Sequence, residues 1–264
     1  MYIPAEVQLI ALIFLLYLHD CIVLAYRNEV VAYRLPLGYR VTFPRNSASF
    51  GKRLMIRLPL GTPFYPAYRL FWSPSPPPSE DAAPDAAWVG AFHAREAALS
   101  ARLLPGTIAL ALCILALMPL GLYFLPILYA LALLPFIYLF IFFQLRQLAR
   151  FHADYPLARE KFWLLVVESL ICPPSAINLV RKVSLSLPVT VDLVAFADAL
   201  LPPEARQGVV NGVIERIEES LLFAEDPDAP PVKMAQGYVA RLRTRDQASG
   251  VRNQREGRSG FPNA

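Results

Sequence analysis

Residues 106–145 read GTIALALCILALMPLGLYFLPILYALALLPFIYLFIFFQL and contain no charged side chain. About 20 helical residues cross a hydrocarbon core of roughly 30 Å, so this stretch is too long for a single span. Pro126 suits the first turn of a second helix, where its missing N–H costs nothing. The stretch therefore predicts a tight hairpin of two transmembrane helices, residues 106–124 and 125–145.

A second apolar run, residues 7–26 (VQLIALIFLLYLHDCIVLAY), has the length of a third span. No Lys or Arg precedes this run, and no small-residue cleavage site follows a short apolar core. These features favour a retained N-terminal anchor over a signal peptide. Residues 162–180 are also apolar, but they contain Glu168 and the helix-breaking pair Pro173-Pro174. That favours a helix on the membrane surface or in a helical domain, with a fourth span as the open alternative.

The composition agrees with a membrane protein. Of the 264 residues, 56% are hydrophobic and 17% are charged, whereas about a quarter of a soluble domain is charged. The three cysteines have no ligand-like spacing, which excludes a disulfide scaffold and a cysteine-rich zinc module. The expected fold class is an integral membrane α-helical protein with three transmembrane helices, a small cytoplasmic antiparallel β module and a cytoplasmic helical C-terminal region.

The basic residues orient the predicted spans. Residues 1–6 and the hairpin turn hold no Lys or Arg, residues 27–102 hold ten, and residues 146–264 hold fifteen. The positive-inside rule then places the N-terminus outside and the C-terminus in the cytoplasm. Abundant Ala, Leu, Arg and Pro suggest a GC-rich bacterial genome, so the expected location is the cell inner membrane, with a multi-pass topology.

The segment 27–72 has the pattern of short strands. EVVAYRL, GYRVTF, RLMIRLPL and FYPAYRLFW are rich in Val, Tyr, Phe and Ile, and FPRNSASFGK at residues 43–52 has the composition of a loop. The segment is also strongly basic, which favours contact with anionic lipid headgroups over nucleic acid, for which no motif is present. The residues expected at this lipid surface are Arg34, Arg40, Lys52, Arg53 and Arg57.

The rest of the chain divides by composition. Prolines predict a stiff linker at 73–84, an apolar stripe predicts an amphipathic helix at 85–104, and a Gly- and Arg-rich composition predicts disorder in the tail. Within residues 146–240 the expected helices are 157–171, 175–186, 191–200 and 204–223. The predicted organisation is an N-terminal transmembrane helix (1–26), a basic β module (27–72), a linker (73–84), an amphipathic helix (85–104), a transmembrane hairpin (105–145), a helical region (146–240) and a basic disordered tail (241–264).

Ionisable residues near the predicted membrane are the candidates for chemistry. His19 and Asp20 lie inside the first predicted span, where a charged side chain costs about 2.5 to 3.5 kcal/mol. They predict a proton relay, a metal-ligand pair or an ion pair, and the alternative is a hydrated position near the headgroups. His152, Asp154 and Glu168 complete the candidate catalytic set. The sequence contains no HExxH or CxxC spacing and no phosphate-binding glycine motif, so no metal site and no cofactor is predicted.

An apolar face on the predicted helix 204–223 is the candidate for partner binding, through Val213, Ile217 and Leu221. The alternative is packing inside a small bundle. Taken together, these features predict a bacterial inner-membrane accessory or scaffold protein that contacts lipid and a protein partner or a second copy of itself. Two alternatives remain: a membrane-embedded enzyme or proton-coupled component that uses Asp20, His19 and His152, and a membrane-surface sensor of anionic lipid.

Overall fold

The computed structural model describes residues 4–26, 28–50, 53–59, 61–72, 84–125, 127–224, 226 and 228–258. The chain is mostly helical and divides into two compact units. Unit 1 comprises Met1–Leu70 and Asp85–Thr190, and unit 2 comprises Phe71–Pro84 and Val191–Ala264. The two units are described separately below.

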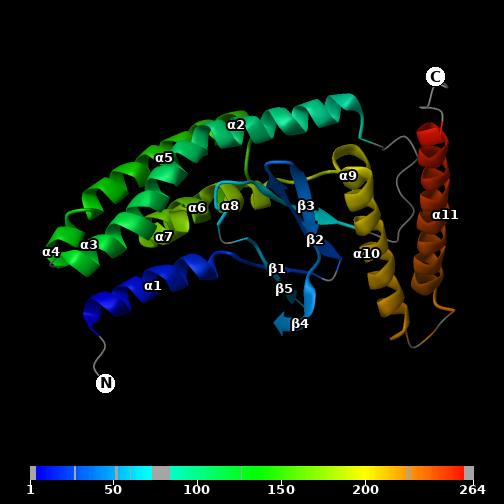
Figure 1. The fold of residues 1–264 in the computed structure, drawn as a ribbon, viewed down its shortest axis with the longest axis horizontal. Coiled ribbons are helices and arrows are strands. Elements are labelled where there is room, and N and C mark those ends of the chain that lie inside the picture. The colour runs from blue at the N-terminus through cyan, green and yellow to red at the C-terminus, as the bar shows by residue number, and fades with distance from the viewer. Residues whose placement is uncertain are drawn as a thin grey trace. The chain divides into compact units, whose positions relative to one another are not determined.

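One long helix dominates unit 1 (Figure 1). It consists of α2 (Ala86–Ala111), a π-helical turn η2 (Leu112–Leu117) and α3 (Met118–Phe124), which follow one another without a break. Asp85 caps its start, since the carboxylate accepts a hydrogen bond from the Trp88 N–H at 2.7 Å. Pro105 lies inside α2 and does not end it, so the predicted amphipathic helix and the predicted second span are one element.

The prediction of three transmembrane helices is wrong. Within the described residues only Ala86–Phe124, 39 residues long, is long and apolar enough to cross a membrane, which is weak support for membrane association. The first apolar run divides: α1 (Ala5–His19) has 15 residues, a length of about 22 Å, and the residues after it form strand β1 (Ile22–Ala25). The third run also divides, into α4 (Ile127–Leu131) and α5 (Leu134–Asp154). The C-terminal half of α5 carries Arg146 and Arg150, and no multi-pass topology is supported.

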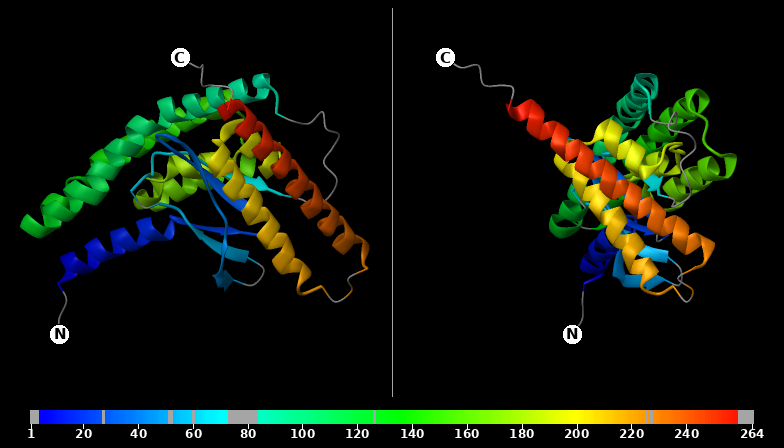
Figure 2. Two further views of the ribbon diagram at one scale, coloured as in Figure 1. Left: turned by 45° about the vertical axis from the view of Figure 1, so that its right-hand side comes forward. Right: turned by 90° about the vertical axis from the view of Figure 1, so that its right-hand side faces the viewer.

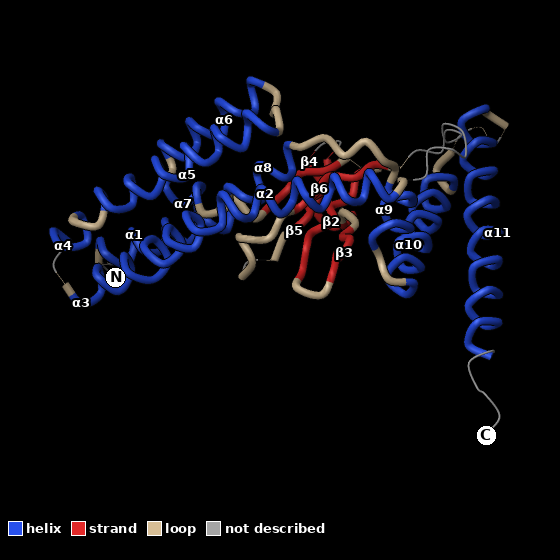
Figure 3. Tube along the Cα trace, turned by 90° about the horizontal axis from the view of Figure 1, so that it is seen from above, coloured by secondary structure: helices blue, strands red, loops and turns tan. Residues whose placement is uncertain are grey.

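The helices of unit 1 pack around the long helix. α5 lies beside α2, and α1 contacts η2 and α3. The buried contacts include Ile13 and Tyr17 from α1, Ile114 from η2 and Ile141 from α5. Figure 3 shows the strands gathered at one end of these helices, with α3 and α4 at the opposite end.

α2 and α5 approach closely at Gly106. A Cβ atom there would lie 2.3 Å from the Gln144 Cγ, so only glycine allows this spacing. Gln144 is fully buried, and its side-chain amide lies 2.7 Å from the Thr107 hydroxyl. With the amide oxygen turned toward Thr107, the nitrogen donates to the Ala176 carbonyl at 3.2 Å, which satisfies both ends of the amide.

The β module has two three-stranded sheets. The first has the order β1-β5-β4, with β4 at Arg45–Phe50 and β5 at Arg53–Arg57. The second has the order β3-β2-β6, with the strands β2 (Glu29–Leu35), β3 (Gly38–Thr42) and β6 (Ala67–Phe71). The structure confirms the four predicted strands. It corrects two segments: β1 was expected inside a transmembrane helix, and β4 inside a loop.

Three further helices complete unit 1. They are α6 (Arg159–Ile171), α7 (Pro173–Ala176) and α8 (Leu179–Ser186). The predicted break at Pro173-Pro174 is confirmed, because α6 ends before the pair and α7 starts on it. The segment 162–180 is therefore no continuous helix. Its residues pack against α2 and α5 through buried Leu99, Leu148 and Val180.

Unit 2 contains α9 (Leu193–Leu200), α10 (Pro203–Leu221) and α11 (Pro230–Arg258). α9 and α10 match the predicted helices, and α10 and α11 lie side by side (Figure 2). The tail from residue 241, predicted to be disordered, continues α11 as helix to Arg258. The predicted linker, residues 73–84, lies outside the described part of the chain except for Pro84.

Candidate functional site

The candidate site begins at Asp20, where α1 ends. The Asp20 N–H donates to the Leu16 carbonyl at 3.3 Å, and the chain then turns into β1. This position brings the carboxylate against α8, where the Lys182 Nζ lies 2.8 Å from Asp20 Oδ2. The side chains are 14% and 20% exposed, respectively, so this ion pair is largely shielded from water.

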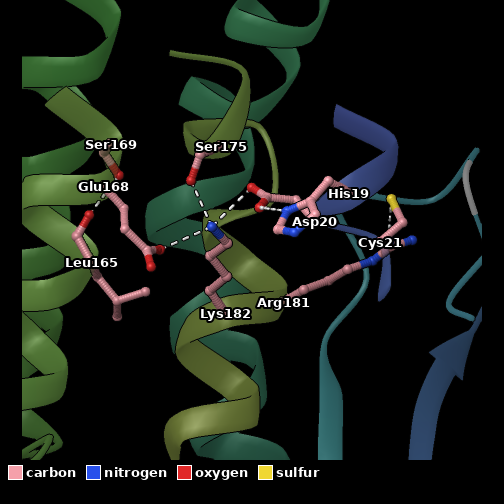
Figure 4. Close-up of polar contacts among 9 residues, drawn as sticks. All are labelled: His19, Asp20, Cys21, Leu165, Glu168, Ser169, Ser175, Arg181 and Lys182. Carbon is pink, nitrogen blue, oxygen red and sulfur yellow. Dashed lines mark hydrogen bonds and ion pairs between the residues drawn. The ribbon is translucent and has the colours of Figure 1, made fainter. Parts of the chain in front are cut away.

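Lys182 joins Asp20 to two more helices (Figure 4). Its Nζ lies 2.9 Å from the Glu168 Oε2 of α6, and it donates to the Ser175 Oγ of α7 at 2.6 Å. His19 stands at the edge of the site, with Nδ1 3.8 Å from Asp20 Oδ1 and a side chain that is 84% exposed. We call Asp20, Glu168, Ser175 and Lys182 the Lys182 site.

The Lys182 site has an uneven charge. Two carboxylates share one ammonium group, so the ionised site carries a net charge of −1 before His19 is counted. The exposed imidazole of His19 lies at its solvent edge, beside Asp20.

Arg181 lies next to the Lys182 site and has a structural role. Its guanidinium is buried and donates to the Thr62 carbonyl at 2.5 Å and to the Pro59 carbonyl, which fixes the chain between β5 and β6. It also donates to the Cys21 Sγ at 3.5 Å. Burial lowers the pKa of the Arg181 guanidinium and raises the pKa of the Cys21 thiol. Cys21 is therefore a protonated packing residue rather than a reactive thiolate.

The other predicted catalytic residues lie elsewhere. The carboxylate of Asp154 pairs with Arg102 at 2.5 Å. The His152 Nδ1 accepts a hydrogen bond from the Leu157 N–H at 2.9 Å, and its ring stacks on Phe162. Of the predicted set, the structure brings together only His19, Asp20 and Glu168.

The predicted lipid-surface residues are only partly described. Arg34 pairs with the buried carboxylate of Glu96, and Arg40 is exposed on β3. Arg53 and Arg57 lie in β5, but their side chains are outside the described part, as is the whole of Lys52. A common basic surface formed by these five residues therefore remains a prediction.

The predicted partner-binding face points into unit 2. Val213 is fully buried, Ile217 is 2% exposed and Leu221 is half-buried. This burial supports the alternative interpretation, packing within a bundle. The exposed apolar side chains at the end of α10 are instead those of Leu222 and Phe223.

Neither the described side chains nor a comparison with known proteins identifies a metal site or a family for this chain. Among the described residues, no group of three or more His, Cys, Asp or Glu side chains is placed to hold a metal ion. No protein-family model, curated protein or solved structure matches the chain.

Proposed function

We propose that the protein is a membrane-anchored accessory protein that contacts a protein partner, with the charge-free part of the long helix, residues 103–124, in the lipid. The observation that carries this proposal is the exposed apolar surface of the helical end of unit 1, formed by α1, η2, α3, α4 and α5. Large exposed apolar patches on a protein indicate a membrane or a partner. Exposed side chains on this surface include Leu12, Leu15, Leu112, Leu117, Leu120, Tyr123, Phe124, Leu128, Phe136, Leu139 and Phe142.

The charge distribution favours lipid as the occupant of this surface. The chain from 103 to 145 contains no Asp, Glu, Lys or Arg, whereas a protein interface usually has a polar rim. Arg102 lies directly before this charge-free stretch, and Arg146 and Arg150 lie directly after it, as expected near lipid headgroups. The inner membrane remains the proposed location.

Lipid contact is tested with a pair of tryptophan variants. Leu117→Trp places the probe on exposed η2, and Ala91→Trp places it on an exposed position near the start of α2. We expect brominated acyl chains to add quenching in Leu117→Trp and little in Ala91→Trp. Equal quenching in the two variants, or release of the protein by alkaline carbonate, would contradict the proposal.

The partner would bind unit 2 at Leu222 and Phe223, which are 82% and 76% exposed. We expect Leu222→Ser combined with Phe223→Ser to lower recovery of the co-purifying protein from native cells. The matched control is Gln207→Ser on the same helix, which should leave recovery unchanged. If the double variant recovers the partner as well as the control does, the partner does not bind at Leu222 and Phe223.

A second candidate function is proton coupling at the Lys182 site. The arrangement of the site favours it, because Lys182 links the carboxylates of Asp20 and Glu168 at 2.8 and 2.9 Å, and His19 lies beside Asp20. We expect Asp20→Asn to abolish pH-dependent activity or phenotype while abundance stays normal. Asp154→Asn removes a carboxylate paired outside the site and is the control. A normal phenotype in Asp20→Asn cells would exclude this function.

A further inference from the structure

A pocket between the β module and α2 combines a buried carboxylate with an apolar wall. Its volume is about 580 Å³, within the range of small-molecule sites, and all its residues belong to unit 1. The polar side is formed by Arg34, Glu96 and Ser100, and the apolar side includes Phe64 and Ile108.

The carboxylate of Glu96 has one satisfied and one unsatisfied oxygen. Its Oε2 pairs with Arg34 and accepts a hydrogen bond from the Tyr39 hydroxyl at 2.7 Å. Its Oε1 is buried and has no hydrogen-bond partner among the described residues. A buried acceptor without a partner is unfavourable, so the site favours a ligand that brings a donor.

The guanidinium of Arg34 supplies the opposite character. Its side chain is 43% exposed, and its bond to Glu96 uses only one of its donor nitrogens. A guanidinium with accessible N–H groups suits a phosphate. Arg34 and Glu96 together therefore match a head that contains both a phosphate and a hydrogen-bond donor.

The apolar wall indicates what is attached to that head. Leu104 and Ile108 lie on α2, and Ile108 is 43% exposed within the charge-free part of the chain that we propose to be in lipid. The cavity has room for a headgroup and the start of one acyl chain.

We infer that this pocket binds one phospholipid of the membrane, with its phosphate at Arg34, a headgroup hydroxyl or ammonium group at Glu96 Oε1, and an acyl chain along Leu104 and Ile108. This inference rests on the proposed membrane anchoring. It adds a specific headgroup site, which general lipid contact does not require.

The test is native mass spectrometry of the full chain in detergent, titrated with phosphatidylethanolamine, phosphatidylglycerol or phosphatidylcholine. The first two headgroups carry an N–H or O–H donor, and the quaternary ammonium of the third does not. We expect one phosphatidylethanolamine or phosphatidylglycerol to be retained, and phosphatidylcholine to bind about tenfold more weakly. If phosphatidylethanolamine binds more strongly, the donor is an ammonium group, and if phosphatidylglycerol does, the donor is a hydroxyl. Equal retention of all three would overturn the role of Glu96.

Two variants locate the lipid. Ile108→Trp fills the pocket, and Leu112→Trp places the same side chain one turn further along, on an exposed position outside it. We expect a loss of about tenfold in bound lipid for Ile108→Trp only. Arg34→Ala should weaken phosphate binding, with Arg69→Ala, which breaks the Arg69–Glu29 pair, as its control. Equal retention by Ile108→Trp and Leu112→Trp would overturn the inference.

The two proposals fail separately. A protein that is released by carbonate but retains one donor-bearing phospholipid would contradict the membrane anchoring and keep the pocket. A protein that resists carbonate and shows no lipid selectivity would contradict the pocket and keep the anchoring.

Discussion

Lys182 connects the end of the first helix with two later helices. Its ammonium group meets carboxylates from α1 and α6 and a hydroxyl from α7. Sequence reasoning found Asp20, His19 and Glu168, because an acid in an apolar segment is unusual. It missed Lys182 and Ser175, since no local pattern links them to an acid about 160 residues earlier in the chain. It also grouped His152 and Asp154 with them by nearness to the membrane, which does not ensure nearness in space.

Removing the ammonium should destabilise unit 1. Lys182→Ala leaves Asp20 and Glu168 without their cation, and we expect a loss of about 1 to 3 kcal/mol in the free energy of unfolding, because the pairs are shielded but not fully buried. Lys233→Ala breaks an exposed pair with Asp228 and should cost about 0.5 kcal/mol or less. Thermal unfolding in detergent measures both variants. Similar melting temperatures for the two would show that the Lys182 site is not stabilising.

Tyr39 makes the stability of unit 1 sensitive to alkaline pH. Burial and the hydrogen bond to Glu96 raise the pKa of its hydroxyl above 10.0, the ordinary value. The folded protein therefore keeps this proton while the unfolded chain releases it. The resulting stabilisation is present below about pH 10 and decreases as the pH rises toward the folded pKa. We expect Tyr39→Phe to flatten the decline in unfolding midpoint between about pH 9 and pH 11. Part of the decline should remain in this variant, because burial also raises the pKa of Tyr68. An unchanged slope would contradict this assignment.

At the scale of elements, local sequence patterns predicted whether a segment is a helix or a strand better than they predicted where it begins and ends. Four strands and the helices α6, α9 and α10 match because alternation, helical periodicity and proline breaks are local signals. The expected helix 175–186 is instead divided between α7 and α8, and α11 was not predicted. β1 and β4 were missed because both depend on β5, and register such as Val23 opposite Ile56 is a long-range contact. Hydropathy measured how apolar residues 7–26 are, but it could not locate the change from helix to strand after His19.

The contact between α2 and α5 depends on a missing side chain. Gly106→Ala would place a Cβ 2.3 Å from the Gln144 Cγ, and Gln144 is held by Thr107. We expect a destabilisation of about 1 to 3 kcal/mol from overpacking. Gly90→Ala in the same helix meets no atom within 4 Å and should stabilise by about 0.5 to 1 kcal/mol. Chemical unfolding followed by circular dichroism compares them. Equal midpoints would mean that α2 and α5 separate at little cost.

At the scale of the whole molecule, the chain builds two units with separate cores. The helical end of unit 1 carries the exposed apolar surface, while the described core of unit 2 is formed by residues such as Phe196, Val213 and Tyr238. Composition predicted a membrane protein with extramembrane regions. It could not predict this division, because contacts such as those of α10 with α11 are long-range and no local pattern records them.

A truncation separates the roles assigned to the two units. A chain that ends at Thr190 keeps nearly all of unit 1 and loses Leu222 and Phe223. We expect it to resist carbonate extraction as the full chain does and to lose the co-purifying partner. Loss of carbonate resistance would mean that unit 2 contributes to anchoring, whereas full partner recovery would place the partner on unit 1.

The π-helical turn Leu112–Leu117 also constrains how this gene can change. An α-helix turns by about 100° per residue, and a π turn holds roughly one residue more than the regular spiral. Deleting one codon within the turn would restore the regular spiral and leave Met118 and Leu122 on the buried face, because the turn absorbs the extra residue. Deleting one codon from α2 would instead rotate these two residues by about 100° relative to the start of the helix. Single-residue deletions should therefore be tolerated across relatives far more often within Leu112–Leu117 than within α2.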